Sequence, residues 1–234
     1  LDEEEEKEES EESEEMEFFS KIKTSPDSFK IKDIDKYYPE KEAKIIKSKI
    51  IKHLSCYKKN IYKDIWLNKE AIYSITNCKI SDLITNAIKE ESKNPEYGLD
   101  DSDKIVIADC TSCIGGNSMS FIRNFRKLIC IEKDPNTAEL LLENLRTIKN
   151  KLKIFKNKYV VKQGSFYDNN NRKILQKNAN ILFIDPPWMT EGDTEKKFRE
   201  RRENKHIYNI DEIKIDNMNM AEIIYNIKTN NDKI

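Results

Sequence analysis

The sequence has little that could cross a membrane or direct secretion. Only 37% of its 234 residues are hydrophobic, 9% are aromatic and five are glycine, whereas 36% are charged. No apolar run approaches the roughly 20 residues that a membrane-spanning helix needs. The start, LDEEEEKEESEESEEME, lacks the basic and apolar parts of a signal peptide. We therefore expect an intracellular protein, cytoplasmic or nuclear, with no membrane partner. Because the chain begins with Leu rather than Met, we expect it to be part of a longer protein.

Charge is distributed unevenly along the chain. Residues 1–17 carry 12 acidic residues and one Lys, so residues 18–234 hold 41 basic residues against 31 acidic ones. A dense block of like charges repels itself and buries nothing, so we expect residues 1–35 to be a largely disordered acidic tail and linker. Such a tail could solubilise the chain, compete with a polyanion for the basic remainder, or contact RNA-processing or transcription proteins.

Cysteine is scarce, and the number of cysteines is odd. The five are Cys56, Cys78, Cys110, Cys113 and Cys130. An odd number without a secretion signal indicates reduced thiols. Cys110 and Cys113 have CxxC spacing and His53 precedes Cys56 by three residues, but there is no second CxxC pair. We therefore expect no metal site.

Residues 36–100 are predicted to form a helical extension. A helix that starts near Pro39 is expected to bury an apolar stripe of Ile45, Ile46, Ile50, Ile51 and Leu54. Its other face is rich in lysine, which suits either a phosphate backbone or a merely solvated surface. A second helix, 77–91, is expected to bury residues at helical spacing, namely Ile80, Leu83, Ile84, Ala87 and Ile88.

Residues 101–234 alternate between strand-like and helix-like runs. Strands are expected at 104–109, 128–132, 159–162 and 180–184, with helices at 117–125, 135–149 and 172–177 between them. This alternation predicts βαβ units and a doubly wound, Rossmann-like α/β core. A last helix, 217–229, with Met220, Ile223, Ile224 and Ile227 facing inward, ends where a fifth strand would begin. We therefore expect the core to be incomplete in this chain.

Distinctive residues follow three of the expected strands. The first group, Asp109 to Asn117, reads DCTSCIGGN and contains a glycine turn through which the backbone could approach a ligand closely. The second is Glu132, an acid that could accept both hydroxyls of a ribose. The third is the sequence DPPW at 185–188. Because ligands of open α/β sheets bind at the carboxyl ends of the strands, we expect one site here.

The DPPW sequence is the most specific of these groups. Two prolines remove two backbone donors, so the carbonyl groups around Asp185 and Pro186 remain free acceptors. Such acceptors are what an exocyclic amine needs when it attacks a methyl group. Trp188 adds a flat face on which a base could stack, especially a cationic one. The alternative is a rigid turn with a Trp that only packs.

The chain has a glycine turn, then a strand-end acid, then DPPW. This order resembles that of S-adenosylmethionine-dependent methyltransferases that modify amino groups of bases. Within that group the chain is most similar to the trimethylguanosine synthases, which are cap guanine-N2 methyltransferases. That family has a turn like DAFCGVGGNT, where this chain reads DCTSCIGGNS at 109–118. It also has an upstream segment like LDREGWFSVTPEKIAEHIA, where this chain reads LNKEAIYSITNCKISDLITNAI at 67–88. The resemblance implies a class I methyltransferase core, S-adenosylmethionine as cofactor and capped RNA as partner.

The resemblance also implies roles for individual residues. The cofactor would be bound by Ser74, Thr76, Asp109, Gly115, Gly116, Asn117, Glu132, Ser165 and Phe166. The amine would be held for catalysis by Asp185, Pro186, Pro187 and Trp188, with Trp188 stacking on 7-methylguanine. Lys196, Lys197 and Arg199 could clamp the phosphate chain of the cap, or belong to a solvated loop.

Three positions differ from the family pattern. Cys113 stands where the family has its first motif glycine, Ser165 replaces the acid that contacts adenine, and Asp185 replaces the serine of SPPW. Two alternatives follow: an adenine amino-methyltransferase on RNA or DNA, and a catalytically silent subunit that binds RNA or a capping or transcription partner. The abundance of Lys, Asn and Ile suggests an AT-rich genome, such as that of a large DNA virus or a protozoan.

Overall fold

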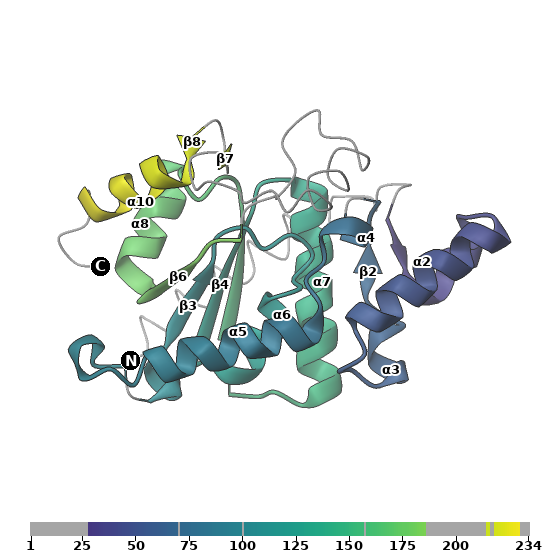
Figure 1. Ribbon diagram of the computed structural model, residues 1–234, viewed down its shortest axis with the longest axis horizontal. Coiled ribbons are helices and arrows are strands. Elements are labelled where there is room, and N and C mark those ends of the chain that lie inside the picture. The colour runs from purple at the N-terminus through teal and green to yellow at the C-terminus, as the bar shows by residue number, and fades with distance from the viewer. Residues whose placement is uncertain are drawn as a thin grey trace, which may run out of the picture.

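The computed structural model describes residues 28–69, 71–99, 101–156, 158–185, 214–215 and 218–229. It is a mixed α/β structure with a parallel sheet at its centre and the N-terminal extension beside it (Figure 1). Within these residues, no helix combines the length and the apolar character that crossing a membrane requires. The predicted last helix lies at Met220–Thr229.

The extension is built from short elements around one long helix. Its elements are β1 (Phe29–Lys30), the 3-10 helix η1 (Ile31–Lys36), α2 (Glu40–His53), α3 (Lys59–Tyr62), β2 (Trp66–Leu67) and α4 (Ala71–Ser74). β1 pairs antiparallel with β2, so residues 28–35, which the sequence assigns to the tail and linker, pack with the extension. In α2 the predicted stripe is wrong at two positions, because Ile45 and Ile51 are exposed while Ile46 and Ile50 are buried.

The central sheet has four parallel strands in the order β5-β4-β3-β6. Their bounds are β3 (Val106–Asp109), β4 (Lys127–Glu132), β5 (Lys158–Gln163) and β6 (Ile181–Phe183). The chain first moves outward from β3 to β4 and β5 and then returns to the other side of β3 for β6. The Rossmann-like fold predicted from the alternating pattern is therefore confirmed, with a topological switch point between β3 and β6.

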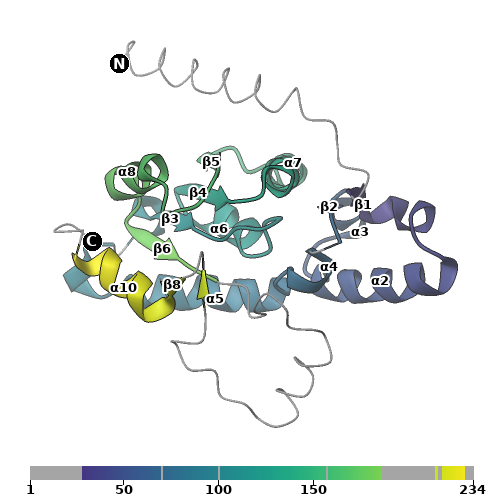
Figure 2. The same cartoon turned by 90° about the horizontal axis from the view of Figure 1, so that it is seen from above.

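Helices cover both faces of this sheet (Figure 2). They are α5 (Cys78–Glu91), α6 (Ser118–Asn124), α7 (Pro135–Leu152), α8 (Asn169–Asn178) and α10 (Met220–Thr229), with 3-10 turns η2 (Pro95–Tyr97) and η3 (Ser102–Lys104) and the short pair β7 (Lys214–Ile215) and β8 (Met218–Asn219). Neighbouring strand residues alternate between two apolar clusters, since Leu128 and Cys130 face one and Ile129 and Ile131 the other. The first cluster continues into the extension.

The predicted inward face of α10 is wrong at one position. Ile223 is buried, as expected, whereas Ile224 is exposed.

Helix α5 has the predicted position, but its buried face is the predicted one only in part, since Ile84 and Ile88 pack half-buried against the apolar core and Ala87 is exposed. Ile80 and Leu83, predicted to be buried, are 52% and 68% exposed, whereas Ser81 and Thr85 are 1% exposed. The buried face is polar because α6 offers hydrogen-bond partners: the Thr85 Oγ1 lies 2.8 Å from Ser120 Oγ. Hydrophobic spacing alone could not reveal this, since it depends on the residues of a neighbouring helix.

A disulfide joins Cys56, just after α2, to Cys78, the first residue of α5. The expectation that all five cysteines are reduced was therefore wrong for this pair. Their Cα atoms are 6.0 Å apart, a separation that a disulfide can bridge. Cys110, Cys113 and Cys130 are free thiols. The spacing of 22 residues in sequence gave no sign that the fold brings the two chain segments together.

Candidate functional site

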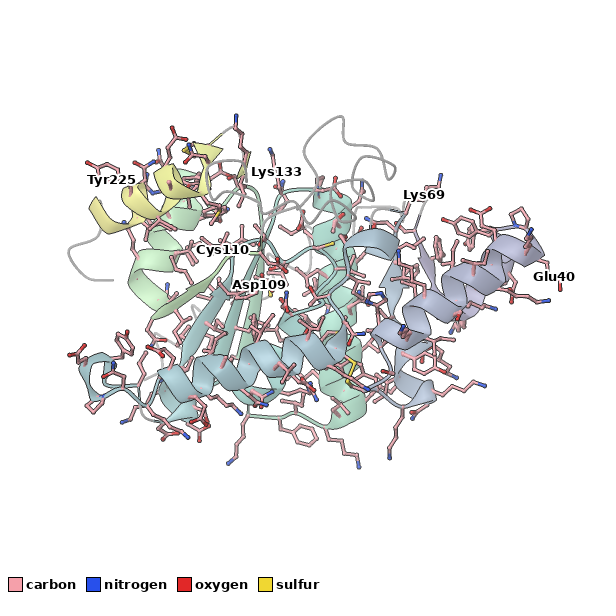
Figure 3. The ribbon with its side chains drawn as sticks, in the orientation of Figure 1. Glu40, Lys69, Asp109, Cys110, Lys133 and Tyr225 are labelled. Carbon is pink, nitrogen blue, oxygen red and sulfur yellow. A yellow bond between two sulfur atoms is a disulfide. The ribbon has the colours of Figure 1, made fainter. Side chains whose placement is uncertain are left out.

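Three acidic residues converge at the carboxyl ends of adjacent strands. Asp109 is the last residue of β3, Glu132 is the last residue of β4, and Asp185 follows β6 by two positions. Figure 3 shows Asp109 and Cys110 at this end of the sheet, with Lys133 at the end of β4. Burial raises the pKa of Asp109 most, and the negative charges of Asp185 and Glu132 raise it further, as expected for neighbouring carboxylates. The three strand-end motifs thus share the switch point of the sheet.

Asp109 is the most buried of the three acids, with 1% of its surface exposed. Burial raises the pKa of its carboxyl to about 7, although the Ser118 hydroxyl and the Thr111 backbone N–H, which both donate to it, oppose this rise. The Ser118 Oγ lies 2.6 Å from Asp109 Oδ2. Asp109 therefore joins the end of β3 to the start of α6. Its hydrogen bonds to Thr111 and Ser118 hold both ends of the segment that contains the glycine turn.

Glu132 holds the same turn from the side. Its Oε2 accepts the backbone N–H of Cys113 at 2.7 Å, and its Oε1 accepts that of Asp134 at 2.9 Å. Burial raises the pKa of this carboxyl, more than the backbone donors lower it. The backbone N–H of Lys133 is a third donor. A carboxylate can accept about four hydrogen bonds, so one acceptor position could still take a ribose hydroxyl.

Asp185 belongs to a cluster of side chains from three distant parts of the sequence. Asn117 Nδ2 donates to Asp185 Oδ2 at 3.1 Å and to Thr76 Oγ1 at 3.1 Å, and the Thr76 hydroxyl lies 3.5 Å from Asp185 Oδ2. Asn117 is 6% exposed, and its Oδ1 has no hydrogen-bond partner among the described residues. Because a carboxylate only accepts, the amide nitrogen must face Asp185, which leaves Oδ1 as an unused acceptor in the site.

Thr111 is a functional candidate that sequence reasoning missed. Its Oγ1 accepts the backbone N–H of Asp185 at 2.9 Å and so joins the loop after β3 to the start of the DPPW sequence. In the same region, the N–H of Cys110 donates to the carbonyl of Phe183 at 2.9 Å. The only signal in the sequence is that Thr111 lies two residues after the strand-end acid, which by itself predicts no partner.

Both glycines of the turn are required by close packing. Gly115 has a φ of +99°, which L side chains rarely adopt, and a Cβ there would lie 2.9 Å from Leu141. At Gly116 a Cβ would lie 2.8 Å from the backbone nitrogen of Thr76. The turn therefore packs directly on the 75–76 segment of the extension, which brings Thr76 to Asn117.

Cys113 occupies the position of the family's first motif glycine and has a φ of +48°, in the left-handed region. Its Sγ lies 3.4 Å from Ser74 Oγ, and burial raises the pKa of the thiol to about 11, so it is a neutral thiol at neutral pH. The side chain fits beside Ser74 instead of blocking the turn. This contact also brings Ser74, the other predicted cofactor residue of the extension, to the loop.

Ser165 and Phe166 lie after β5, on the same edge of the sheet, but are separate from the Asp185 cluster. Ser165 is held in a local turn, since its N–H donates to Asp168 Oδ2 at 2.8 Å and its carbonyl accepts from Asn171 at 2.9 Å. Phe166 is 5% exposed and belongs to the apolar cluster beneath α8 and α10. It lines a small cavity of about 40 Å³ with Leu175 and Leu182.

Several predicted residues lie outside the described residues: Pro186, Pro187, Trp188, Lys196, Lys197 and Arg199. Their roles remain predictions. Within the described ranges, no group of three or more His, Cys, Asp or Glu side chains could hold a metal ion.

Comparisons with known proteins found a solved structure and a family model that match this chain. A solved structure of a proposed methyltransferase from Porphyromonas gingivalis W83 is similar to this chain, with 12% sequence identity and a TM-score of 0.42; the similarity covers 68% of this chain and 37% of that one. No curated protein matches the chain. Residues 105–232, more than half of the chain, match the model of a family described as Conserved hypothetical protein 95. The chain therefore belongs to this methyltransferase-like family.

Proposed function

We propose that this protein is an S-adenosylmethionine-dependent methyltransferase that acts on the exocyclic amine of guanine in a 7-methylguanosine RNA cap. The observation that carries the proposal is the position of Asp185. Its carboxylate lies at the switch point of the sheet and is held by Asn117 and Thr76 beside the glycine turn. An acceptor fixed in this way can orient an amine N–H.

The residues at the strand ends suit this cofactor. S-adenosylmethionine, when bound, supplies a methyl group already activated by a positively charged sulfonium. The carboxylates of Glu132 and Asp185 give the site a negative character that complements a cation. The spare acceptor position of Glu132 suits a ribose hydroxyl, and the unused Asn117 Oδ1 suits an ammonium N–H.

The contribution of the protein to the reaction is mostly positioning. Asp185 accepts one N–H of the target amine, and its hydrogen bonds to Asn117 and Thr76 keep the carboxylate from turning away. Thr111 fixes the Asp185 backbone. A reacting pair held near its attack geometry loses most of the entropic part of the barrier, so small displacements of these groups should cost rate.

The choice of guanine over adenine rests on the resemblance to cap enzymes and on Trp188, whose ring would stack on the cationic 7-methylguanine. The aspartate of DPPW favours the alternative, an adenine amine as target. The two are separated by substrate: a cap enzyme should need the 7-methyl group, whereas an adenine enzyme should accept uncapped RNA.

The test is transfer of labelled methyl from S-adenosylmethionine to 7-methylguanosine-capped RNA, with uncapped, adenine-containing RNA in parallel. We expect label in the cap guanine. Asp185→Ala should lower kcat by about 100-fold or more, the usual cost of losing a positioned polar group. Thr76→Val, which keeps the shape but removes the hydroxyl, should lower it less. Label only in adenine would favour the alternative target, and no label with a folded chain would favour a silent binding subunit.

A further inference from the structure

The extension contains a long stretch without any acidic residue. From Ala43 to Lys63 the chain has seven lysines and no Asp or Glu. Two of these lysines are neutralised from outside the stretch, because Lys44 pairs with Glu40 and Lys47 pairs with Asp35. The others are concentrated at the end of α2 and the start of α3. Such a density of one charge attracts a partner of opposite charge.

Four exposed lysines gather where α2, α3 and α5 meet. Lys52 lies on the last turn of α2, Lys58 and Lys59 begin α3, and Lys79 follows the first residue of α5. We call these four residues the lysine patch. In the part of the chain that the structure describes, no acidic side chain forms an ion pair with any of them.

Two contacts fix this arrangement. Asn77 Nδ2 donates to the Lys52 carbonyl at 3.4 Å, and the disulfide joins Cys56, two residues before Lys58, to Cys78, one residue before Lys79. In both Figure 1 and Figure 2 the ends of α2 and α3 lie next to the start of α5. The lysines therefore surround one junction instead of being spread along the chain.

This junction is directly connected to the candidate site. Asn77, which contacts Lys52, is the neighbour in sequence of Thr76, and Thr76 contacts both Asn117 and Asp185. A chain of phosphates that leaves a target base at Asp185 and passes over Thr76 would continue onto the lysine patch. A nucleoside has no phosphate and a cap dinucleotide has fewer phosphates than the patch has lysines, so neither could use the whole patch.

We propose that the lysine patch of Lys52, Lys58, Lys59 and Lys79 binds the phosphate backbone of single-stranded RNA that extends from the target nucleotide. This inference rests on the proposed function, since it identifies RNA as the substrate class. Lysines of this kind contribute affinity that does not depend on sequence and that decreases as salt rises, because binding releases counterions. The patch should therefore affect binding of a long RNA and leave binding of the cap alone unchanged.

The experiment compares two triple variants of the 234-residue chain. Lys52→Ala, Lys58→Ala and Lys59→Ala remove three charges from the patch. Lys156→Ala, Lys173→Ala and Lys177→Ala remove three exposed charges elsewhere and serve as the matched control. Binding is followed without cofactor, by fluorescence anisotropy of a capped 20-nucleotide RNA labelled at its 3′ end, over a series of salt concentrations. The dinucleotide cap analogue is measured by competition, and thermal unfolding checks that each variant is folded.

We expect the patch variant to bind the RNA about tenfold more weakly at 0.1 M salt, with the slope of log K against log salt reduced by about 2, since each phosphate contact on a single strand contributes about 0.7. The control variant should bind like the original chain, and neither should change the cap analogue. Equal weakening by both triples, or no weakening by the patch triple, would overturn the inference. Patch-dependent RNA binding without any methyl transfer would support this inference while contradicting the proposed function.

Discussion

Asp109 is a structural support of the candidate site. Its raised pKa results from burial, so we expect its protonation state to affect stability more than the reaction. It is almost completely buried, and its hydrogen bonds hold the start of α6 and the loop after β3. At the level of single residues, the site thus divides into supports and contacts. Asp109 and the two glycines shape the turn, whereas Asp185 and Asn117 offer polar atoms to a ligand.

The raised pKa of Asp109 predicts a change of stability with pH. An unfolded Asp has a pKa of about 3.9, whereas the folded pKa is about 7, so the fold favours the protonated form. Its contribution to stability is full below the unfolded pKa and is lost as pH rises through about 7. We expect the free energy of unfolding to fall between pH 5 and pH 8, by about 1 kcal/mol or more.

Asp109→Asn should remove this part of the pH dependence, because an amide does not titrate. The measurement is urea unfolding at pH 5 and pH 8 for both proteins, taking the difference between them so that His53 and Glu132, which also titrate, largely cancel. Glu96→Gln, at an exposed position, is the control. An original chain and an Asp109→Asn variant with parallel pH profiles would contradict the prediction.

At the scale of elements, most boundaries follow from local pattern. Pro135 at the first turn and Asp134 as N-cap start α7, and Asn77 caps α5. The direction in which α5 faces does not follow from pattern. Its face toward α6 is polar because Asp82 and Thr85 bind Ser120 and Arg123. Ile80 and Leu83 are exposed, whereas Ile84 and Ile88 still pack against the core. The spacing of apolar residues therefore predicted a helix correctly and its buried face only in part.

The difference between the predicted and the observed buried face of α5 can be tested at one exposed and one buried position. Leu83→Gln should change the free energy of unfolding by no more than about 0.5 kcal/mol, as exposed substitutions usually do. Thr85→Ala should cost about 1–2 kcal/mol, because Thr85 Oγ1 donates to the Ser81 carbonyl at 2.8 Å and contacts Ser120 in a buried setting. Chemical unfolding measures both. A larger loss for Leu83→Gln than for Thr85→Ala would restore the orientation predicted from the sequence.

For the whole molecule, the extension and the Rossmann-like core behave as parts of one packed unit. One apolar cluster runs from Phe29 in β1 to Val161 in β5. The Trp66 backbone is hydrogen-bonded to Asn144 on α7, at 2.7 Å and 3.0 Å. Thr76 then reaches the core from the extension. The candidate site therefore depends on the extension for one of its side chains.

The disulfide between Cys56 and Cys78 should stabilise this unit. Closing a loop of this length restricts the unfolded chain and is worth about 3 kcal/mol. We expect dithiothreitol to lower the free energy of unfolding by about that amount. A Cys56→Ser variant should have the lower stability already and should not respond to the reductant. Identical unfolding of the original chain with and without dithiothreitol would contradict the prediction.

The sequence by itself determined the class of fold and the edge of the sheet on which the site lies. Apolar strand runs alternating with helices specify a parallel sheet, and parallel strands bring Asp109, Glu132 and Asp185 to one edge. Local residue types carry this information, so it can be read without a structure.

Only the tertiary structure decided which side chains meet at that edge. The contacts of Thr76 with Asn117 and Asp185, of Thr111 with the Asp185 backbone, and of Cys56 with Cys78 join residues far apart in the chain. Each depends on how separately folded elements pack: Gly116 admits the 75–76 segment because it has no side chain, and α6 turns the polar face of α5 inward. Such packing depends on the shapes and hydrogen-bond partners of two elements together, which the pattern of either one does not contain.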